Sequence, residues 1–318
     1  MRVLQIIGPG RAEVVEAPRP SPREGEVLVR VSAVSSCPHW DMTLMDGVDI
    51  FDRPGFPQYP QPPGREGHEM CGFVEELGAG VADLRPGQRV VAWRTMPAGR
   101  WGYYAEYAAV SGQDLLAVPE HLPDAAVAPL ELAMCVAVCF LDIPDVAGLR
   151  FSVGGLGGAG LVAVQMASAA GAAEVLGFDP LPERRALALE LGATRCLDPR
   201  SEEAAVLRCQ PRGARVDAAV DCSGVGASVE FQMDLAGRWL CLFGVQHETY
   251  RYGLRQRGLT LYGYGAHRRE AADYALARVL DGRVRLSPLI SRELPLSQFA
   301  EGVDLLRRRQ AIKVLYRP

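Results

Sequence analysis

The chain has 318 residues, of which 48% are hydrophobic, and a formal net charge of −4 at pH 7. This length exceeds what one hydrophobic core ordinarily supports, so we expect two domains. The small charge and the absence of a long basic run argue against nucleic acid as a partner. No N-terminal apolar stretch has the length of a signal peptide, and the apolar run 127–141 contains Glu131 and is short for a membrane span. We therefore expect a cytoplasmic protein without a membrane partner.

The N-terminal part of the sequence has a β-rich pattern. Residues 26–34 (EVLVRVSAV) alternate apolar and polar side chains, and further strands are predicted at 70–78, 88–93 and 104–110. Turn residues separate these segments. Many short strands predict a twisted, barrel-like β-domain. From 122 to 142 the pattern changes to that of a buried helix.

After residue 149 short apolar strands alternate with helices. Strands are predicted at 150–155, 173–179, 195–198, 216–224, 239–244 and 259–265, and helices at 160–171, 182–192 and 228–237. This alternation predicts a parallel, doubly wound sheet and an α/β fold class. The C-terminal part predicts helices at 271–282 and 296–309 and a final strand at 311–317.

The turn between the first strand and helix of this part has the pattern G-x-G-x-x-G. Its first glycine allows a tight turn, its second leaves room for a pyrophosphate, and its third lets the helix pack against the strand. The helix N-terminus presents free N–H groups to the phosphates. The residues of this loop are Gly155, Gly157, Gly158, Ala159 and Gly160.

The next strand ends at Asp179, 19 residues after Gly160. An acidic residue at this place can hydrogen-bond the adenosine ribose and repels a 2′-phosphate, which favours NAD(H) over NADP. Arg184 could also contact the ribose and moderates that preference. The alternative is a glycine-rich turn in which Asp179 caps a helix.

Cysteine, histidine and glutamate side chains form a candidate metal site. Cys37 follows the predicted strand 26–34, and His68 lies in a loop 31 residues later. Thiolate and imidazole are good zinc ligands, and a catalytic zinc has three protein ligands and an open position. Glu131 lies inside an apolar run, where a carboxylate needs a cation or a proton. Cys135 lies one helical turn later and is an alternative ligand. The alternative for Glu131 is an arginine partner or a protonated acid.

Together these segments resemble the medium-chain dehydrogenase/reductase superfamily, in its zinc-dependent alcohol and polyol dehydrogenase branch. The resemblance covers nearly the whole chain. It rests on the segments GEVLVRVSAVSSC, GREGHEMCGFVEELGAGVADLRPGQRVVA, YAEYAAV, GLGGAG, VDAAVDCSG and GRVRLSPLISRELPLSQFAEGVDLLRRRQAIKVLYRP. It implies a GroES-like, β-rich catalytic domain over 1–145 and 266–318. A Rossmann domain that binds NAD(H) is implied over 146–265.

The resemblance implies a role for each candidate ligand. Cys37 and His68 match the family's zinc ligands, and Glu69 matches a ligand or near-ligand of the sorbitol- and threonine-dehydrogenase type. Glu131 matches the third ligand, because it lies 24 residues before the first glycine of the loop. His39 occupies the position of the family's proton-relay hydroxyl and could act as the base itself; the alternative is that it only shapes the pocket.

The sequence departs from the family near these ligands. Asp41 is displaced by one position, so its contact with His68 is open, and Leu132 replaces the usual proline after Glu131. The lobe with four clustered cysteines that holds a structural zinc is missing, because only 94–104 joins the two strands there. We therefore expect one catalytic zinc per chain and no structural zinc.

The resemblance extends to further residues of the cofactor site. Phe243, Gly244 and Val245 are expected to line the nicotinamide, Cys222 to lie beside the cofactor, and Lys313 to reach the pyrophosphate. For these positions the alternative is ordinary packing or a solvated charge.

The expected activity is hydride transfer between NAD(H) and a secondary alcohol of polyol, sugar or cyclitol type, with a small-molecule alcohol or ketone as the partner. The alternatives are a zinc-free quinone or enone reductase of the same fold, and a non-catalytic NAD(H)-binding protein. Relatives of this family pair through the edge strand of the Rossmann sheet, here 259–265, so we expect a homodimer or homotetramer.

Overall fold

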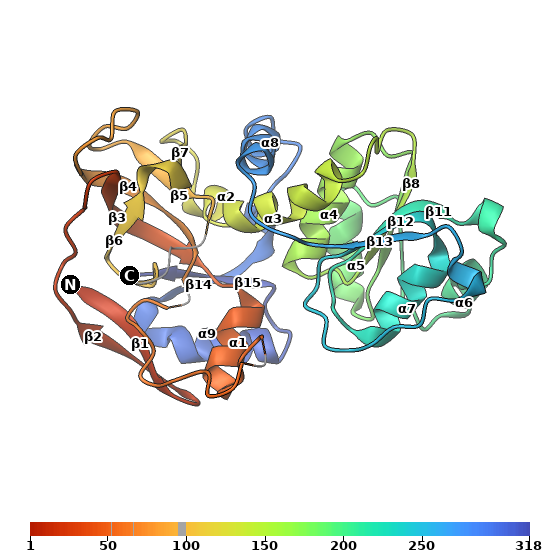
Figure 1. Ribbon diagram of the computed structural model, residues 1–318, viewed down its shortest axis with the longest axis horizontal. Helices are drawn as coiled ribbons and strands as arrows, with labels where there is room; N and C mark the ends of the chain where they lie inside the picture. The colour runs from red at the N-terminus through yellow and green to blue at the C-terminus, as the bar shows by residue number, and fades with distance from the viewer. Residues whose placement is uncertain (52, 66, 95–99) are drawn as a thin grey trace. The chain divides into compact units, whose positions relative to one another are not determined.

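Figure 1 shows the computed structural model, which describes residues 1–51, 53–65, 67–94 and 100–318. The chain forms two compact units. The first consists of Met1–Glu131 and Leu286–Pro318, and the second of Leu132–Arg285. The boundaries of the structure follow Glu131 and Arg285, whereas those expected from the sequence follow residues 145 and 265.

The second unit contains a six-stranded sheet in the order β10-β9-β8-β11-β12-β13, and all its neighbouring strands are parallel. The strands are β8 (Arg150–Gly154), β9 (Glu174–Phe178), β10 (Arg195–Leu197), β11 (Val216–Asp221), β12 (Ala236–Leu242) and β13 (Thr260–Gly263). The central strands are buried along nearly their whole length, as expected of a sheet with helices on both faces. The predicted doubly wound parallel sheet is confirmed.

Four helices connect successive strands of this unit, and a fifth, α8, follows its last strand. They are α4 (Gly158–Ala169), α5 (Pro182–Glu190), α6 (Glu202–Arg208), α7 (Gly226–Leu235) and α8 (Arg269–Leu280). Helix α6 was not expected, because its seven residues are too few for a clear apolar period. Its start is fixed locally: the Ser201 side chain accepts a hydrogen bond of 3.2 Å from the Ala204 amide.

The first unit contains a largely antiparallel sheet in the order β14-β15-β3-β4-β5-β7, with β6 also paired to β3, and a separate two-stranded sheet β1-β2. The strands are β1 (Arg2–Gly8), β2 (Arg11–Glu16), β3 (Glu26–Ser35), β4 (Glu69–Leu77), β5 (Arg89–Ala92), β6 (Tyr107–Ser111), β7 (Leu115–Ala117), β14 (Ile290–Pro295) and β15 (Lys313–Arg317). The predicted β-rich domain is confirmed. Strand β3 pairs with β4, β6 and β15, so this central strand organises the unit.

Helix α1 (Pro38–Asp46) begins directly after Cys37. Pro38 occupies its first turn, where the missing N–H is not needed, and Gly47 ends it in the left-handed conformation. The helix lies beside α9 (Phe299–Arg307) in Figure 1 and packs against it. Cys37 is therefore held at the junction between β3 and a packed helix.

The single helix expected over 122–142 is two helices, α2 (Asp124–Val127) and α3 (Leu130–Leu141). Pro129 separates them, because it has no backbone N–H to donate within a helix. Among the described residues, only Asp124–Leu141 has the length and hydropathy of a membrane span, and 72% of it is buried inside the structure, as in a core helix.

The segment in which we expect no structural zinc lobe, 94–104, includes residues 95–99. These five residues lie outside the described part of the chain.

Gly72 offers a test of the contact between β3 and β4. A Cβ atom there would lie 2.3 Å from the backbone oxygen of Arg30 and 2.8 Å from a methyl group of Val29. We expect Gly72→Ala to push the two strands apart and to destabilise the first unit by about 1–3 kcal/mol, as overpacking does. Thermal unfolding followed by circular dichroism measures this. Gly8→Ala is the control, because nothing lies within 4 Å of a Cβ there; equal melting temperatures for the two variants would contradict the prediction.

Candidate metal and dinucleotide sites

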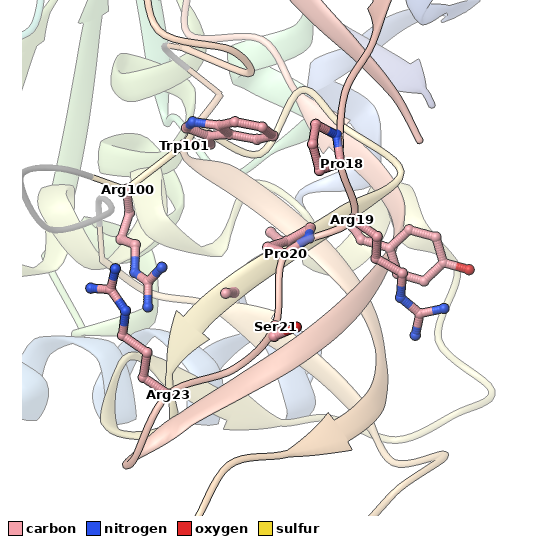
Figure 2. Close-up of a pocket in the computed structure, with 10 residues that line it drawn as sticks. Pro18, Arg19, Pro20, Ser21, Arg23, Arg100 and Trp101 are labelled. Atoms are coloured by element: carbon pink, nitrogen blue, oxygen red, sulfur yellow. The ribbon is translucent and has the colours of Figure 1, made fainter.

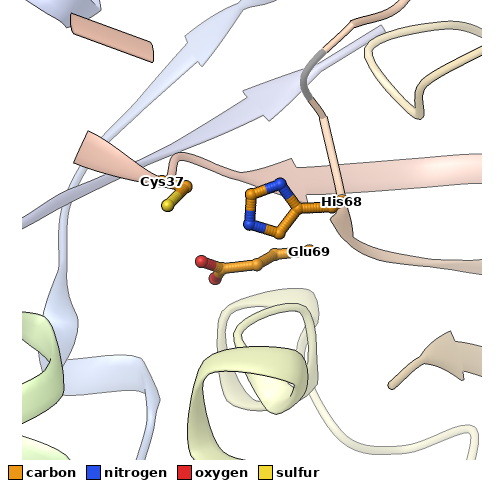
Figure 3. A group of neighbouring side chains, drawn as sticks. All are labelled: Cys37, His68 and Glu69. Atoms are coloured by element: carbon orange, nitrogen blue, oxygen red, sulfur yellow. The ribbon is translucent and has the colours of Figure 1, made fainter. Parts of the chain in front are cut away.

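Three of the predicted metal ligands meet in the first unit. The ligand atoms of Cys37, His68 and Glu69 lie within 4.8 Å of one another, and Figure 3 shows their side chains grouped together. The strand register explains this: Ser35, the last residue of β3, is paired with Glu69, the first residue of β4. Cys37 and His68 follow and precede these paired residues, so antiparallel pairing brings them together across 31 positions.

Glu131, the fourth predicted ligand, also lies beside this cluster. It occupies the first turn of α3, is 5% exposed, and its Oε2 lies 3.8 Å from Nε2 of His68. The sequence-based argument that a buried carboxylate here needs a positive partner is thus consistent with the structure. Cys135, the alternative ligand, belongs to the second unit, where its Sγ lies 3.1 Å from the Tyr264 hydroxyl.

The structure corrects the role expected for Lys313. This residue, the only lysine in the sequence, is 1% exposed. Its Nζ lies 2.8 Å from Oε1 of Glu69 and also donates to the backbone oxygen of Ser36. The buried ammonium is satisfied inside the first unit, so it does not serve as a pyrophosphate ligand. The sequence did contain a signal: a lone lysine in the apolar run IKVLY needs a buried acid.

The electrostatics of the cluster fit a bound cation. Burial lowers the pKa of His68, but the neighbouring Cys37, Glu131 and Glu69 raise it more, so its pKa is well above the usual value. Burial raises the pKa of Glu69, against the lowering effect of Lys313 and His68. Oε2 of Glu69 is buried and has no hydrogen-bond partner among the described residues. Since an unpaired buried oxygen is costly, this atom fits a metal ligand, and sulfur, nitrogen and oxygen donors together suit zinc.

Asp41 forms a second buried contact that sequence reasoning missed. Its carboxylate accepts hydrogen bonds of 3.0 and 2.9 Å from the Tyr104 hydroxyl and one of 3.1 Å from the Cys37 amide. Burial raises the pKa of Asp41 to about 7, although the Tyr104 hydrogen bond lowers it. Asp41 therefore holds the backbone of Cys37. His39 lies between them in the first turn of α1 and is partly exposed.

The glycine loop of the second unit has the geometry that its motif predicts. Gly155 has a φ of +79°, which favours glycine, and a Cβ there would lie 2.8 Å from the Ser223 side chain. A Cβ on Gly160 would lie 1.8 Å from the backbone oxygen of Gly155, so this glycine permits the close packing of helix on strand. Gly157 is the N-cap of α4, and no side chain caps that helix.

The start of α4 is therefore open to an anion. The backbone around Gly157 is uncrowded, because a Cβ there would meet only Arg184, at 3.8 Å. Gly158 and Ala159 form the first turn and are partly exposed. Uncapped N–H groups at a helix N-terminus of this kind bind phosphate.

Asp179 stands directly after β9 and is 9% exposed. Its two carboxylate oxygens accept hydrogen bonds of 2.8 Å from the Leu156 amide and 2.9 Å from the Leu181 amide. The residue thus connects the glycine loop to Leu181, the residue before α5. Arg184 donates to the Leu156 carbonyl at 3.5 Å, so it lies at the same loop.

The remaining predicted cofactor residues follow β11 and β12. The Cys222 amide donates to the carbonyl of Gly154, and the amides of Phe243 and Gly244 both donate to the carbonyl of Asp221. Val245 is 38% exposed. These residues lie at the carboxyl ends of neighbouring parallel strands, the edge at which open α/β sheets bind ligands.

Known proteins resemble both halves of the chain. A family model described as an alcohol dehydrogenase GroES-like domain matches residues 23–120, and one described as a zinc-binding dehydrogenase matches 158–256. The L-threonine 3-dehydrogenase of Bacillus velezensis is 28% identical over 96% of this chain and 95% of that protein. The alcohol dehydrogenase of Geobacillus stearothermophilus is 31% identical over 61% of this chain and 62% of that protein.

A solved structure agrees. A protein of Sinorhizobium meliloti, described as a zinc-binding dehydrogenase and bound to NADP, has a TM-score of 0.86 and 26% identity. The match covers 100% of this chain and 99% of that one. With the cysteine, histidine and glutamate cluster and the glycine loop, these likenesses establish an oxidoreductase that uses zinc and a nicotinamide cofactor. The chain belongs to the zinc-dependent alcohol and polyol dehydrogenase branch of the medium-chain dehydrogenase/reductase superfamily.

Proposed function

We propose that this dehydrogenase interconverts a secondary alcohol of polyol, sugar or cyclitol type and its ketone, with NAD(H) and one zinc ion per chain. The proposal rests on one observation: Cys37, His68 and Glu69 converge within 4.8 Å, and a buried oxygen of Glu69 has no hydrogen-bond partner among the described residues. In this proposal Cys37 and His68 hold the ion, and a carboxylate of Glu69 or Glu131 completes its protein ligands.

The residues around this cluster have positioning and proton-transfer roles in the proposed reaction. A bound zinc ion supplies Lewis acidity, which lowers the pKa of an alcohol beside it. Lys313 holds Glu69 in place, and Asp41 holds the amide of Cys37. We assign to His39 the acceptance of the hydroxyl proton, because an imidazole exchanges protons near neutral pH. A bound nicotinamide would supply the redox chemistry, by exchanging hydride with the substrate carbon.

The preference for NAD(H) over NADP(H) rests on Asp179. Its carboxylate is fixed beside the glycine loop by the Leu156 and Leu181 amides, where it would repel a 2′-phosphate. Arg184 lies at the same loop and weakens this preference. The NADP in the Sinorhizobium meliloti structure shows that a relative accepts the phosphorylated cofactor.

Oligomeric state and location are part of the proposal. Strand β13 is the last strand of the parallel sheet, and Thr260, Leu261 and Gly263 on it are exposed. An exposed strand edge can pair with a second copy of itself, so we propose a homodimer or homotetramer. Separately, we propose that the protein is located in the cytoplasm.

Metal analysis and a substrate panel test the proposed function. We expect about one zinc per chain in the purified protein, and turnover with NAD on sugar alcohols, cyclitols or butane-2,3-diol, followed by NADH absorbance. L-threonine belongs in the panel because relatives carry the name L-threonine 3-dehydrogenase. Zinc-free protein that reduces quinones or enones would overturn the proposal. Nucleotide binding without turnover on any alcohol or carbonyl would also contradict it.

Removal of the thiol ligand tests the cluster directly. We expect Cys37→Ser to lose zinc and to lower turnover by more than about 100-fold, because even the outer partners of metal ligands contribute about 10- to 100-fold. Zinc content, turnover and NADH binding are measured together, and NADH binding is expected to persist. Cys209→Ser is the matched control, since Cys209 is exposed. Unchanged turnover in Cys37→Ser would exclude the assigned role.

The buried ion pair predicts a pattern in stability. We expect Lys313→Met to destabilise the zinc-free protein by about 3–5 kcal/mol, because Glu69 is left buried without its cation. The double variant Lys313→Met with Glu69→Gln should recover much of that loss, since no uncompensated charge remains. Thermal unfolding of the chelator-treated variants provides the measurement. A double variant less stable than Lys313→Met alone would contradict the pairing.

Asp179 provides a test of cofactor choice. Asp179→Asn keeps an oxygen acceptor but removes the negative charge, so we expect the affinity for NADPH relative to NADH to rise by about tenfold or more, equivalent to about 1.4 kcal/mol. Cofactor titrations followed by fluorescence measure the ratio. Asp273→Asn is a control, since Asp273 is an exposed residue of α8 that pairs with Arg269. An unchanged ratio in Asp179→Asn would rule out charge-based discrimination.

A further inference from the structure

A pocket of about 410 Å³ lies in the first unit, between the chain that follows β2 and strand β6. None of its lining residues belongs to the metal cluster. Figure 2 shows three arginines, a tryptophan and two prolines around it. The lining residues are Pro18, Arg19, Pro20, Ser21, Arg23, Arg100, Trp101, Tyr107, Ala108 and Ala109. A pocket of this volume falls in the range of small-molecule sites.

Arg100 is fixed on one side of the pocket. Its guanidinium donates to both carboxylate oxygens of Glu26, with Nε 2.8 Å from Oε1, and the two side chains are only 16% and 15% exposed. The same carboxylate accepts the Arg23 amide at 2.8 Å. Burial raises the pKa of Glu26, but the contacts with Arg100 and Arg23 outweigh it and hold the pKa below its usual value. Glu26 is therefore ionised, and its acceptor capacity is largely used.

The Arg23 side chain differs from its neighbours. Its guanidinium forms no salt bridge or side-chain hydrogen bond with a described residue and acts on Glu26 only through its charge. Figure 2 shows this guanidinium pointing toward that of Arg100. Arg19, in contrast, is 3.0 Å from Oε1 of Glu75 and lies 4.2 Å over the ring of Tyr107. Three guanidinium groups thus face two carboxylates, in a chain whose net charge is negative. The pocket therefore has an excess of positive charge, and the guanidinium of Arg23 carries it.

Aromatic and pyrrolidine rings form the rest of the wall. Trp101 is half-buried and lies next to Arg100 in the sequence, and Pro18 and Pro20 lie across from it. Planar aromatic surface accepts flat rings by stacking. Arginine in a fixed fork binds phosphate and carboxylate through paired N–H groups.

We propose that this pocket binds an aromatic anion, a flat ring that carries a phosphate or carboxylate group. The anionic group lies between Arg23 and Arg100, and the ring lies against Trp101. Arg100 is already oriented by Glu26, so its side chain loses little conformational entropy when the ligand binds. The site is separate from the dehydrogenase reaction and uses none of its residues.

Calorimetric titration with phenyl phosphate and benzoate tests the proposal. The zinc-loaded protein is saturated with NADH, so that the dinucleotide site is occupied. We expect one of the two probes to bind, and their relative affinity identifies the anionic group. Inorganic phosphate and benzyl alcohol each supply one half of the ligand and should bind at least about tenfold more weakly. Absence of binding by both probes, or equal affinity for inorganic phosphate and phenyl phosphate, would overturn the proposal.

Variants locate the binding. Arg23→Gln is expected to weaken the probe by about tenfold or more, because a charged hydrogen bond contributes about 1.5–3 kcal/mol. Trp101→Leu should weaken the aromatic probe but leave inorganic phosphate unchanged. Arg11→Gln, an exposed arginine outside the pocket, should bind as the natural chain does. Melting temperatures show that each variant is folded.

A last variant separates this pocket from the metal cluster. Cys37→Ser should bind the probe with unchanged affinity, because the pocket contains no zinc ligand. Probe binding that is lost in Cys37→Ser, or that persists unchanged in Arg23→Gln, would place the anion at the metal instead and exclude the pocket.

Discussion

A buried ion pair between Lys313 and Glu69 is the constraint on which the first unit depends. Both side chains are 1% exposed, and the ammonium also donates to the carbonyl of Ser36. Removing each charge from water costs several kcal/mol, which only close pairing with additional hydrogen bonds offsets. The pair therefore fixes the start of β15 against the start of β4 and the end of β3. Those segments carry Cys37 and His68, so the ligand geometry follows from the pair.

The pair also decides what the cluster can hold. Lys313 occupies one oxygen of Glu69 and leaves the other, Oε2, buried and directed to no described hydrogen-bond partner. Glu131 brings a second carboxylate to His68, and Cys37 can bring a thiolate. The single ammonium of Lys313 does not neutralise the negative charge that these groups can carry. The same excess of negative charge raises the pKa of His68. A divalent cation held by these groups would restore neutrality.

The dinucleotide loop could be predicted in detail because its parts are local. Gly155, Gly160 and Asp179 belong to one strand-helix-strand segment, and their spacing in the sequence is enough to predict the geometry of the loop. The metal cluster could be predicted only in part from the residues themselves. A carboxylate in an apolar run, Glu131, indicated a cation, but its grouping with Cys37 was inferred from the family resemblance. The Lys313 contact spans 244 positions and the Tyr104 to Asp41 contact spans 63. Such pairings depend on strand register and packing across the sheet, which hydrophobic periodicity does not report.

The choice of cation at each place follows from the arrangement of its acceptors. Lys313 contacts two oxygens on different elements, the Ser36 carbonyl and Glu69 Oε1, and a compact ammonium with rotatable donors can serve both. Arg100 meets both oxygens of one carboxylate, Glu26, which suits a planar fork. The only lysine of the chain thus contacts two separate acceptors as a compact charge, whereas Arg100 contacts one carboxylate through a paired, planar fork.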